Sequence, residues 1–230
     1  MKIPRPPHNW SVSPVQAIAI QKRLAALVRD DKPTRPFRYI AGVDAAFSAD
    51  GQSCLAGAVL WDMSKSVMVE QQTAIHPLTF PYIPGLLTFR EAPALIAALR
   101  KLRQTPDCLI CDGQGVAHPR RCGIATHLGL IVHLPAIGCA KSRLIGDYKM
   151  PAEWRGAWTP LTFKDEVIGA VLRSRDHVRP LFISIGNNID LGSAMQTILA
   201  CGRGYRLPEP TRLADQLVGR LKREISVTSR

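Results

Sequence analysis

Three apolar runs with strand character follow one another early in the chain and then give way to alternating helical and strand patterns. The runs span residues 38–47, 54–61 and 66–73, and turn residues at Asp50-Gly51 and 63–65 separate them. Strands joined by short turns pair antiparallel, whereas strand and helix alternation builds a layered α/β domain. The sequence therefore predicts a three-stranded antiparallel meander that continues into an α/β sheet.

The other elements are predicted from periodicity and from residues that begin or end helices. A first helix is expected from Ser13 to Arg29, with Pro14 in its first turn. Residues 145–163 form the one long irregular stretch, which we expect to be a surface or binding loop. Further helices are expected at 91–103, 121–130 and 190–201, and further strands at 107–112, 136–142, 166–173 and 180–185.

The length of 230 residues suits a single domain. We expect that domain to span residues 1–230, with peripheral tails at 1–12 and 217–230. No apolar run reaches the roughly 18 residues that cross a bilayer, and the first ten residues lack the apolar core of a secretory signal. A soluble, monomeric, cytoplasmic protein with no membrane partner is expected.

Charge narrows the class of partner. Thirty lysine and arginine residues against 18 acidic ones give a formal charge of +12, which suits a polyanion such as nucleic acid. Some proteins are basic without binding nucleic acid, so this argument needs a site. The cysteines offer no zinc site, because Cys108 and Cys111 are the only close pair, and we predict them to be reduced thiols in a buried strand.

Two aspartates occur where a buried strand should have apolar residues. Asp44 lies within an apolar run, and Asp112 ends another immediately before Gly113. An unpaired buried carboxylate is costly, so Asp44 requires an arginine partner, an exposed strand edge or a metal, and Asp112 could also cap a helix. If the two strands are neighbours, both carboxylates face one point and can hold Mg²⁺. Glu91, at a helix start, is an ordinary first-turn acid when read alone.

Four long motifs resemble the endonuclease V family and occur in that family's order. They are Gly42-Val-Asp-Ala-Ala-Phe47, Pro81-Tyr-Ile-Pro-Gly-Leu-Leu-Thr-Phe-Arg-Glu91, Asp112-Gly-Gln-Gly-Val-Ala-His-Pro-Arg-Arg121 and Gly204-Tyr-Arg-Leu-Pro-Glu-Pro-Thr-Arg212. The likeness extends from about residue 13 to 216. It implies an α/β, RNase H-like fold, with a mixed five-stranded sheet flanked by helices.

The resemblance implies a metal-dependent endonuclease that repairs deaminated adenine. It would nick DNA at the second phosphodiester bond 3′ to deoxyinosine and leave a 5′-phosphate, with Mg²⁺ as cofactor and Mn²⁺ able to substitute. Asp44, Asp112 and Glu91 would bind the metal, and His118 and Lys141 would act near the scissile phosphate. Read alone, the last two are a loop histidine and a solvated lysine. Further phosphate contacts are expected from Arg120, Arg121, Arg206 and Arg212.

The same resemblance assigns recognition of the damaged base. Pro81, Tyr82, Ile83 and Pro84 would form a wedge that replaces a flipped base in the helix, although Tyr82 alone would be read as a turn aromatic packed on the core. The base pocket would be lined by Gly85, Leu87, Gly113 and Ile124. Alternative functions are a non-catalytic inosine-binding protein and an inosine-specific endoribonuclease.

One position departs from the family pattern. After the strand that ends at Gly186, many family members have a histidine near the metals, whereas this chain has Asn187. Its amide oxygen makes Asn187 a candidate metal ligand that cannot titrate as histidine does. Asp190 is expected to be the N-cap of the next helix rather than a fourth ligand.

Overall fold

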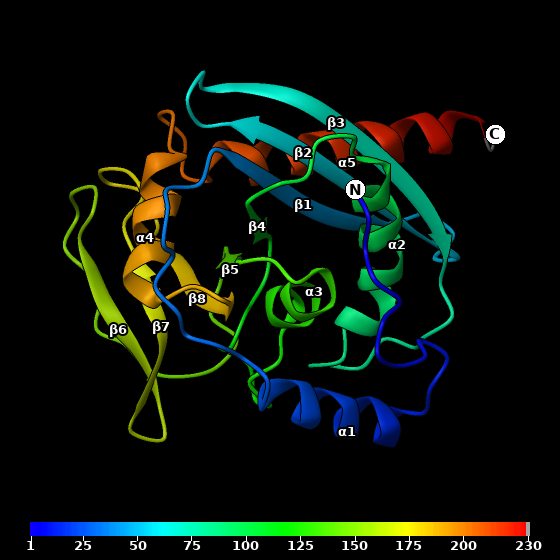
Figure 1. Ribbon diagram of the computed structural model, residues 1–230, viewed down its shortest axis with the longest axis horizontal. Helices are drawn as coiled ribbons and strands as arrows, with labels where there is room; N and C mark the ends of the chain where they lie inside the picture. Colours follow the sequence, from blue (N-terminus) through cyan, green and yellow to red (C-terminus); the bar gives the residue numbers. More distant parts are fainter. Residues whose placement is uncertain (229–230) are drawn as a thin grey trace.

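The computed structural model describes residues 1–228, with side chains up to Ser226, and is built on one eight-stranded mixed sheet. The strand order is β3-β2-β1-β4-β5-β8-β7-β6. The sheet twists across the molecule, as Figure 1 shows. The α/β class with flanking helices is confirmed, but the expected five strands are eight. The strands are β1 (Tyr39–Phe47), β2 (Ser53–Asp62), β3 (Val67–Pro77), β4 (Cys108–Cys111), β5 (Ala136–Ala140), β6 (Trp158–Phe163), β7 (Glu166–Leu172) and β8 (Leu181–Asn187).

The first three strands form the predicted antiparallel meander. β1 pairs with β2 and β2 with β3 in antiparallel register, and β1 then pairs in parallel with β4, which pairs in parallel with β5. β8 returns antiparallel to β5. The expectation of an irregular stretch over 145–163 is wrong for its last part, because β6 forms a hairpin with β7.

Residues 1–228 form five helices: α1 (Pro14–Ala25), α2 (Thr88–Lys101), α3 (Ile124–Val132), α4 (Leu191–Ala200) and α5 (Glu209–Thr228). The last four pack on the sheet, whereas α1 packs on α3. Ala41 and Val43 of β1 belong to the apolar cluster that includes residues of α2 and α3, whereas Ile40 belongs to the cluster that includes residues of α4. Alternate residues of β1 therefore serve opposite layers, as the two-residue strand period requires. None of these helices, within residues 1–228, is long and apolar enough to cross a membrane.

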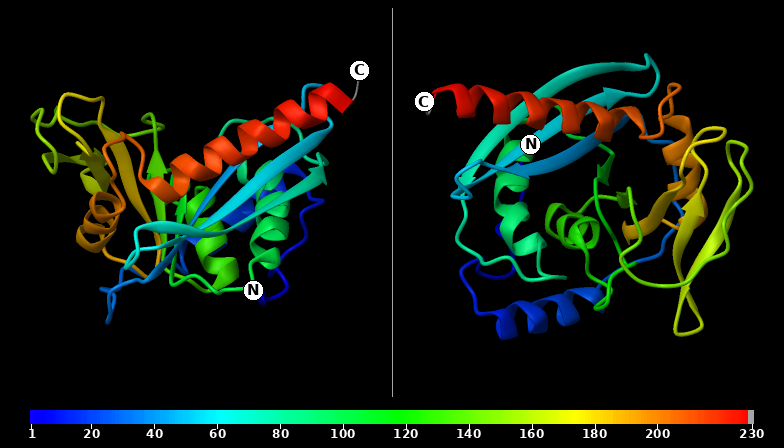
Figure 2. Two further views of the ribbon diagram at one scale, coloured as in Figure 1. Left: turned by 90° about the horizontal axis from the view of Figure 1, so that it is seen from above. Right: turned by 180° about the vertical axis from the view of Figure 1, so that it is seen from behind.

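The ends of the chain differ in how they lie against this core. Trp10, in the segment expected to be peripheral, packs against two of the apolar clusters, and His8 reaches buried His127 with a distance of 2.7 Å between their Nε2 atoms. At the other end α5 crosses β1 and β2, as both views in Figure 2 show. Leu217 and Val218 of the expected second tail are buried there, and its last two residues lie outside the described part.

Local sequence explains where the helices start. Ser13 and Gln16 form a reciprocal capping box at α1, with Pro14 at the first helical position. Asp190 accepts a hydrogen bond from the Ser193 main chain at 2.9 Å and is the predicted N-cap of α4. All six cysteines are buried and unpaired, including the predicted thiols Cys108 and Cys111 of β4.

Candidate active site

Two neighbouring parallel strands place Asp44 beside Asp112. Val43 of β1 is in register with Cys111 of β4, and the Asp112 main-chain N–H donates to the Val43 carbonyl at 3.2 Å. The next residue on each strand is therefore the aspartate, and both lie at the edge where the parallel strands β4 and β5 end. The sequence prediction that these two carboxylates share one point of the sheet edge is confirmed by their metal-ligand spacing.

A third carboxylate, Asp215 of α5, joins them and was missed by the sequence reasoning. One oxygen of each of Asp44, Asp112 and Asp215 lies within 4.8 Å of the others. α5 can approach because two strand residues are glycine: a Cβ on Gly42 would lie 2.1 Å from the Pro210 carbonyl carbon, and one on Gly57 would lie 2.8 Å from Val218 Cγ2. The apolar residues at 214, 217, 218 and 221 have helical spacing and could have indicated this helix.

The electrostatics of this carboxylate group favour a cation. Burial and then the neighbouring Asp112 raise the pKa of Asp44 from 3.8 to about 7. Lys141, which follows β5, lies with its Nζ 2.6 Å from Asp112 and 2.9 Å from Asp215. Burial alone would lower the pKa of Lys141, but hydrogen bonds to both carboxylates outweigh it and raise the pKa above its ordinary value. One ammonium thus balances part of the charge of three clustered acids.

Glu91 faces the same site from the other layer of helices. It lies in the first turn of α2 and is half-buried. Burial and then Asp44 and Asp112 raise its pKa to about 8. Its carboxylate stands outside the group of three within 4.8 Å, although it lines the adjoining cavity. Glu91 therefore feels the charges of Asp44 and Asp112 and approaches them from α2, whereas Asp215 approaches from α5.

The residues present fit a divalent metal ion. Three carboxylates converge from β1, β4 and α5, and oxygen ligands are those that hard cations such as Mg²⁺ prefer. Burial and then the like charge of Asp112 raise the pKa of Asp44, and a divalent cation would offset both effects. The donor set contains no thiol or imidazole within the described residues, which argues against a zinc-type site.

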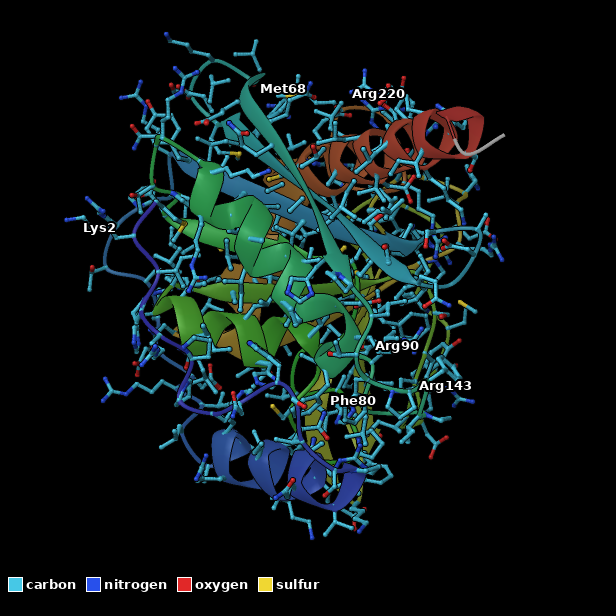
Figure 3. The ribbon with its side chains drawn as sticks, turned by 90° about the vertical axis from the view of Figure 1, so that its right-hand side faces the viewer. Lys2, Met68, Phe80, Arg90, Arg143 and Arg220 are labelled. Carbon is cyan, nitrogen blue, oxygen red and sulfur yellow. The ribbon has the colours of Figure 1, made fainter. Side chains whose placement is uncertain are left out.

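A cavity of about 430 Å³ opens beside the carboxylates. Seven of the eight residues predicted for base recognition line it, Pro81 being the exception, together with Glu91, Asp112, His118 and Lys141. In Figure 3 the labelled residues Phe80, Arg90 and Arg143 lie on one side of the molecule, between α2 and α1. Arg143 lines the cavity, and Arg90 donates to the carbonyl of Phe80, the residue before Pro81, at 2.7 Å. The seven predicted base-recognition residues that line the cavity are Tyr82, Ile83, Pro84, Gly85, Leu87, Gly113 and Ile124.

Tyr82 points outward rather than into the core. Its side chain is 69% exposed, so its reading as a turn aromatic packed on the core is wrong. Gly85 has φ +78° and Gly113 has φ +153°, which are backbone conformations that favour glycine. A Cβ on Gly113 would lie 2.6 Å from Ile124 Cγ2. The two glycines thus keep main chain at the surface of the cavity.

His118 and Arg120 both form hydrogen bonds within the protein. His118 is 4% exposed, and its Nε2 lies 2.9 Å from the Gly85 carbonyl oxygen. Burial and then Arg120 lower its pKa to about 4, so it is neutral at physiological pH. Arg120 donates to the same carbonyl at 2.6 Å. Arg121 and Arg212 form ion pairs with glutamates, and Arg206 donates to main-chain carbonyls at 141, 179 and 180.

Asn187 does not belong to this site, and the expectation that it is a candidate metal ligand is wrong. It pairs with Ala136 at the start of β5, whereas Lys141 follows the end of β5. Its side-chain oxygen accepts from the Arg29 main chain at 3.1 Å. The physical reason is direction: β8 runs antiparallel to β5, so the carboxyl end of β8 reaches the opposite edge of the sheet.

Known proteins resemble this chain in both sequence and fold. A family model described as Endonuclease V matches residues 21–216. The endonuclease V of Roseiflexus castenholzii is 48% identical over 222 residues, which cover 96% of this chain and 99% of that protein. The crystal structure of endonuclease V from Streptomyces avermitilis superposes with a TM-score of 0.90 at 39% identity, over 98% of this chain and 100% of that one.

A more distant structure adds a ligand. The Ciona intestinalis endonuclease V, crystallised with a 24mer DNA containing an inosine followed by a ribo-adenosine, has a TM-score of 0.81 at 24% identity and covers 92% of this chain and 98% of that one. At this identity the likeness concerns the fold alone. The family model and the bacterial relative extend over nearly all of the residues described above, so this chain belongs to the endonuclease V family of nucleases, which hydrolyse phosphodiester bonds.

Proposed function

We propose that this protein is a Mg²⁺-dependent endonuclease that nicks DNA at the second phosphodiester bond 3′ to deoxyinosine and leaves a 5′-phosphate. The observation that carries the proposal is that a group of three carboxylates adjoins a cavity large enough for a flat base, with Asp112 belonging to both. The inosine-containing DNA bound by the Ciona relative supports the choice of substrate. The formal charge of +12 suits a phosphate backbone.

Asp44, Asp112 and Asp215 would hold the metal, with Glu91 completing its surroundings. When bound, Mg²⁺ would supply activation of water and stabilisation of the charge that develops on the phosphate and the leaving 3′ oxygen. Lys141 keeps its ammonium charged beside Asp112 and would contact a phosphate oxygen. Mn²⁺ accepts similar oxygen donors and is expected to substitute.

Recognition would combine the wedge with the cavity. Tyr82 is exposed and free to stack in the space that a flipped base leaves. The flipped hypoxanthine would enter between Gly85 and Gly113, where main-chain amides can approach its O6 and N1. His118 is neutral and bonded to Gly85, so we assign it to the wall of the cavity rather than to proton transfer.

The test is a cleavage panel with labelled oligonucleotides. Duplex and single-stranded DNA with one deoxyinosine, and the matching inosine RNA, are incubated with protein and Mg²⁺, Mn²⁺ or chelator. We expect a single metal-dependent nick between the first and second nucleotides 3′ to the lesion, which Asp44→Asn and Asp215→Asn abolish. Equal cutting by wild type and variants would reject the site.

The panel also separates the alternatives. Tight binding to inosine without any metal-dependent nick would identify a non-catalytic binding protein, which the complete carboxylate group argues against. Cutting confined to the RNA strand would identify an endoribonuclease, in which 2′-hydroxyl contacts decide the choice. Mapping the cleavage products with an end label on each strand in turn locates the scissile bond.

A further inference from the structure

A glutamine of α1 is buried completely although its helix lies at the rim of the molecule. Gln21 is 0% exposed, and each of its polar side-chain atoms has a protein partner. Its Nε2 donates at 3.0 Å to the carbonyl of Gly85 and at 3.0 Å to the carbonyl of Cys122. Its Oε1 accepts from Arg120 Nε at 2.6 Å. A buried amide that is satisfied so fully fixes its neighbours firmly.

The two carbonyls belong to two separate chain segments at the cavity, which we call its two walls. Gly85 follows Pro84 and lines the cavity, whereas Cys122 immediately precedes Gly123 and Ile124, which also line it. A single amide group therefore bridges the walls. The Gly85 carbonyl is also contacted by His118 and Arg120, so three nitrogen atoms converge on one oxygen. The Arg120 main-chain N–H donates to His118 Nδ1, which leaves the Nε2 hydrogen of His118 for Gly85.

Apolar packing holds α1 in the place that this bridge needs. Ala17, Ile20 and Leu24 form one buried cluster with Phe80, Leu86 and Phe89, which flank the wedge segment. Figure 1 shows α1 lying beneath the loop that leads into α2 and beside α3. The helix is therefore a rigid support from which Gln21 reaches both walls.

We propose that Gln21 is a positioning residue that sets the separation of the two walls and thereby the preference of the cavity for hypoxanthine. The proposal rests on the proposed function, since it concerns the same cavity. A purine fits a slot of fixed width, and the guanine 2-amino group must be kept out at the edge of that slot. Gln21 does not touch the base; it acts through Gly85 and Cys122.

The test variant is Gln21→Leu, which keeps the side-chain size and removes all three hydrogen bonds. Its matched control is Gln16→Leu on the same helix, which removes the capping-box bond to Ser13 but touches no cavity residue. Cleavage kinetics are measured on duplexes with deoxyinosine or deoxyguanosine at the same position. We expect Gln21→Leu to raise KM for deoxyinosine about tenfold, the change that corresponds to ~1.4 kcal/mol, and to lower the preference over deoxyguanosine, with kcat within about twofold.

Two results would overturn the proposal: unchanged KM and preference, or a loss of kcat alone that matches the Gln16→Leu control, since that would mean general destabilisation. A readout without substrate covers the case in which the wild type cuts neither duplex and the proposed function itself fails. Amide hydrogen exchange over residues 81–87 and 122–124 should rise in Gln21→Leu and stay unchanged in Gln16→Leu. Equal exchange in both variants would also reject the bridge.

Discussion

Replacing Asp44 with asparagine is expected to stabilise the metal-free protein at pH 8 while removing its activity. Burial and Asp112 raise the pKa of Asp44 from 3.8 to about 7. The folded state therefore holds this proton more tightly than the unfolded chain, and stability from this group is lost as the pH rises from 3.8 through about 7. At pH 8 the shift corresponds to about 4 kcal/mol, at ~1.4 kcal/mol per pKa unit.

Asparagine does not recover the whole of this cost. The amide is not an exact substitute for the protonated carboxyl, since it puts an NH₂ group where the carboxyl has an oxygen, and a buried donor left without a partner costs about 1–3 kcal/mol. We therefore expect a net gain of about 2 kcal/mol, or a rise in Tm of about 4–8 °C for a domain of this size. At pH 4, where the wild-type carboxyl is protonated in the folded state, the gain should vanish.

Urea unfolding of chelator-treated protein at both pH values measures the effect. Asp50→Asn is the control, because Asp50 is exposed and its pKa is lowered by its hydrogen bond with Ser48. Adding Mg²⁺ should then stabilise the wild type and not Asp44→Asn, since a ligand stabilises only the state that binds it. An Asp44→Asn variant no more stable than wild type at pH 8, or one equally stabilised at pH 4, would refute the reasoning.

Three further outcomes follow from single side chains. Burial and then His8 lower the pKa of His127 to about 3, so the free energy of unfolding should fall as the pH drops from 6.5 towards 3, by up to ~1.4 kcal/mol per pH unit; denaturation of His127→Phe should show a flatter pH profile. Tyr82→Ala should leave Tm unchanged, because the side chain is exposed, yet lower duplex cleavage by about 10- to 100-fold, the range of one lost stacking contact. Gly113→Ala should raise KM, since its Cβ would meet Ile124 Cγ2 at 2.6 Å, and Ile124→Ala in the same chain should restore part of the binding if that clash is the cause.

Local patterns predicted much of the fold. The meander, the helix starts at Ser13 and Asp190, and the buried thiols of β4 each depend on neighbouring residues, which a sequence displays directly. Asp44 and Asp112 were predicted for the same reason: a carboxylate inside an apolar run is anomalous without a partner. Their meeting required only that two strands be adjacent, which the register of β1 and β4 confirms.

The rest of the fold and of the site depends on contacts between residues far apart in sequence. Asp215 is one acid on an amphipathic helix, and nothing near it in sequence distinguishes it from Glu224 on the same helix. Its role depends on Gly42 and Gly57, which let α5 lie against strands far away in sequence. The prediction for Asn187 was wrong because it also depended on long-range geometry. The direction of a strand in the sheet decides which edge its last residue reaches. β7 was predicted, but its hairpin partner β6 lacked a strong periodic signal, with Pro160 inside it.

The packing of α5 on β1 also determines the stage of synthesis at which the carboxylate group can form. Asp215 follows Asp44 by 171 residues (215 minus 44), while Asp112 and Lys141 lie between them. During synthesis the meander and the central strands leave the ribosome before the third carboxylate has been made. A growing chain can therefore begin to fold its sheet, but its group of three clustered aspartates is completed only when α5, one of the last elements, packs over Gly42 and Gly57.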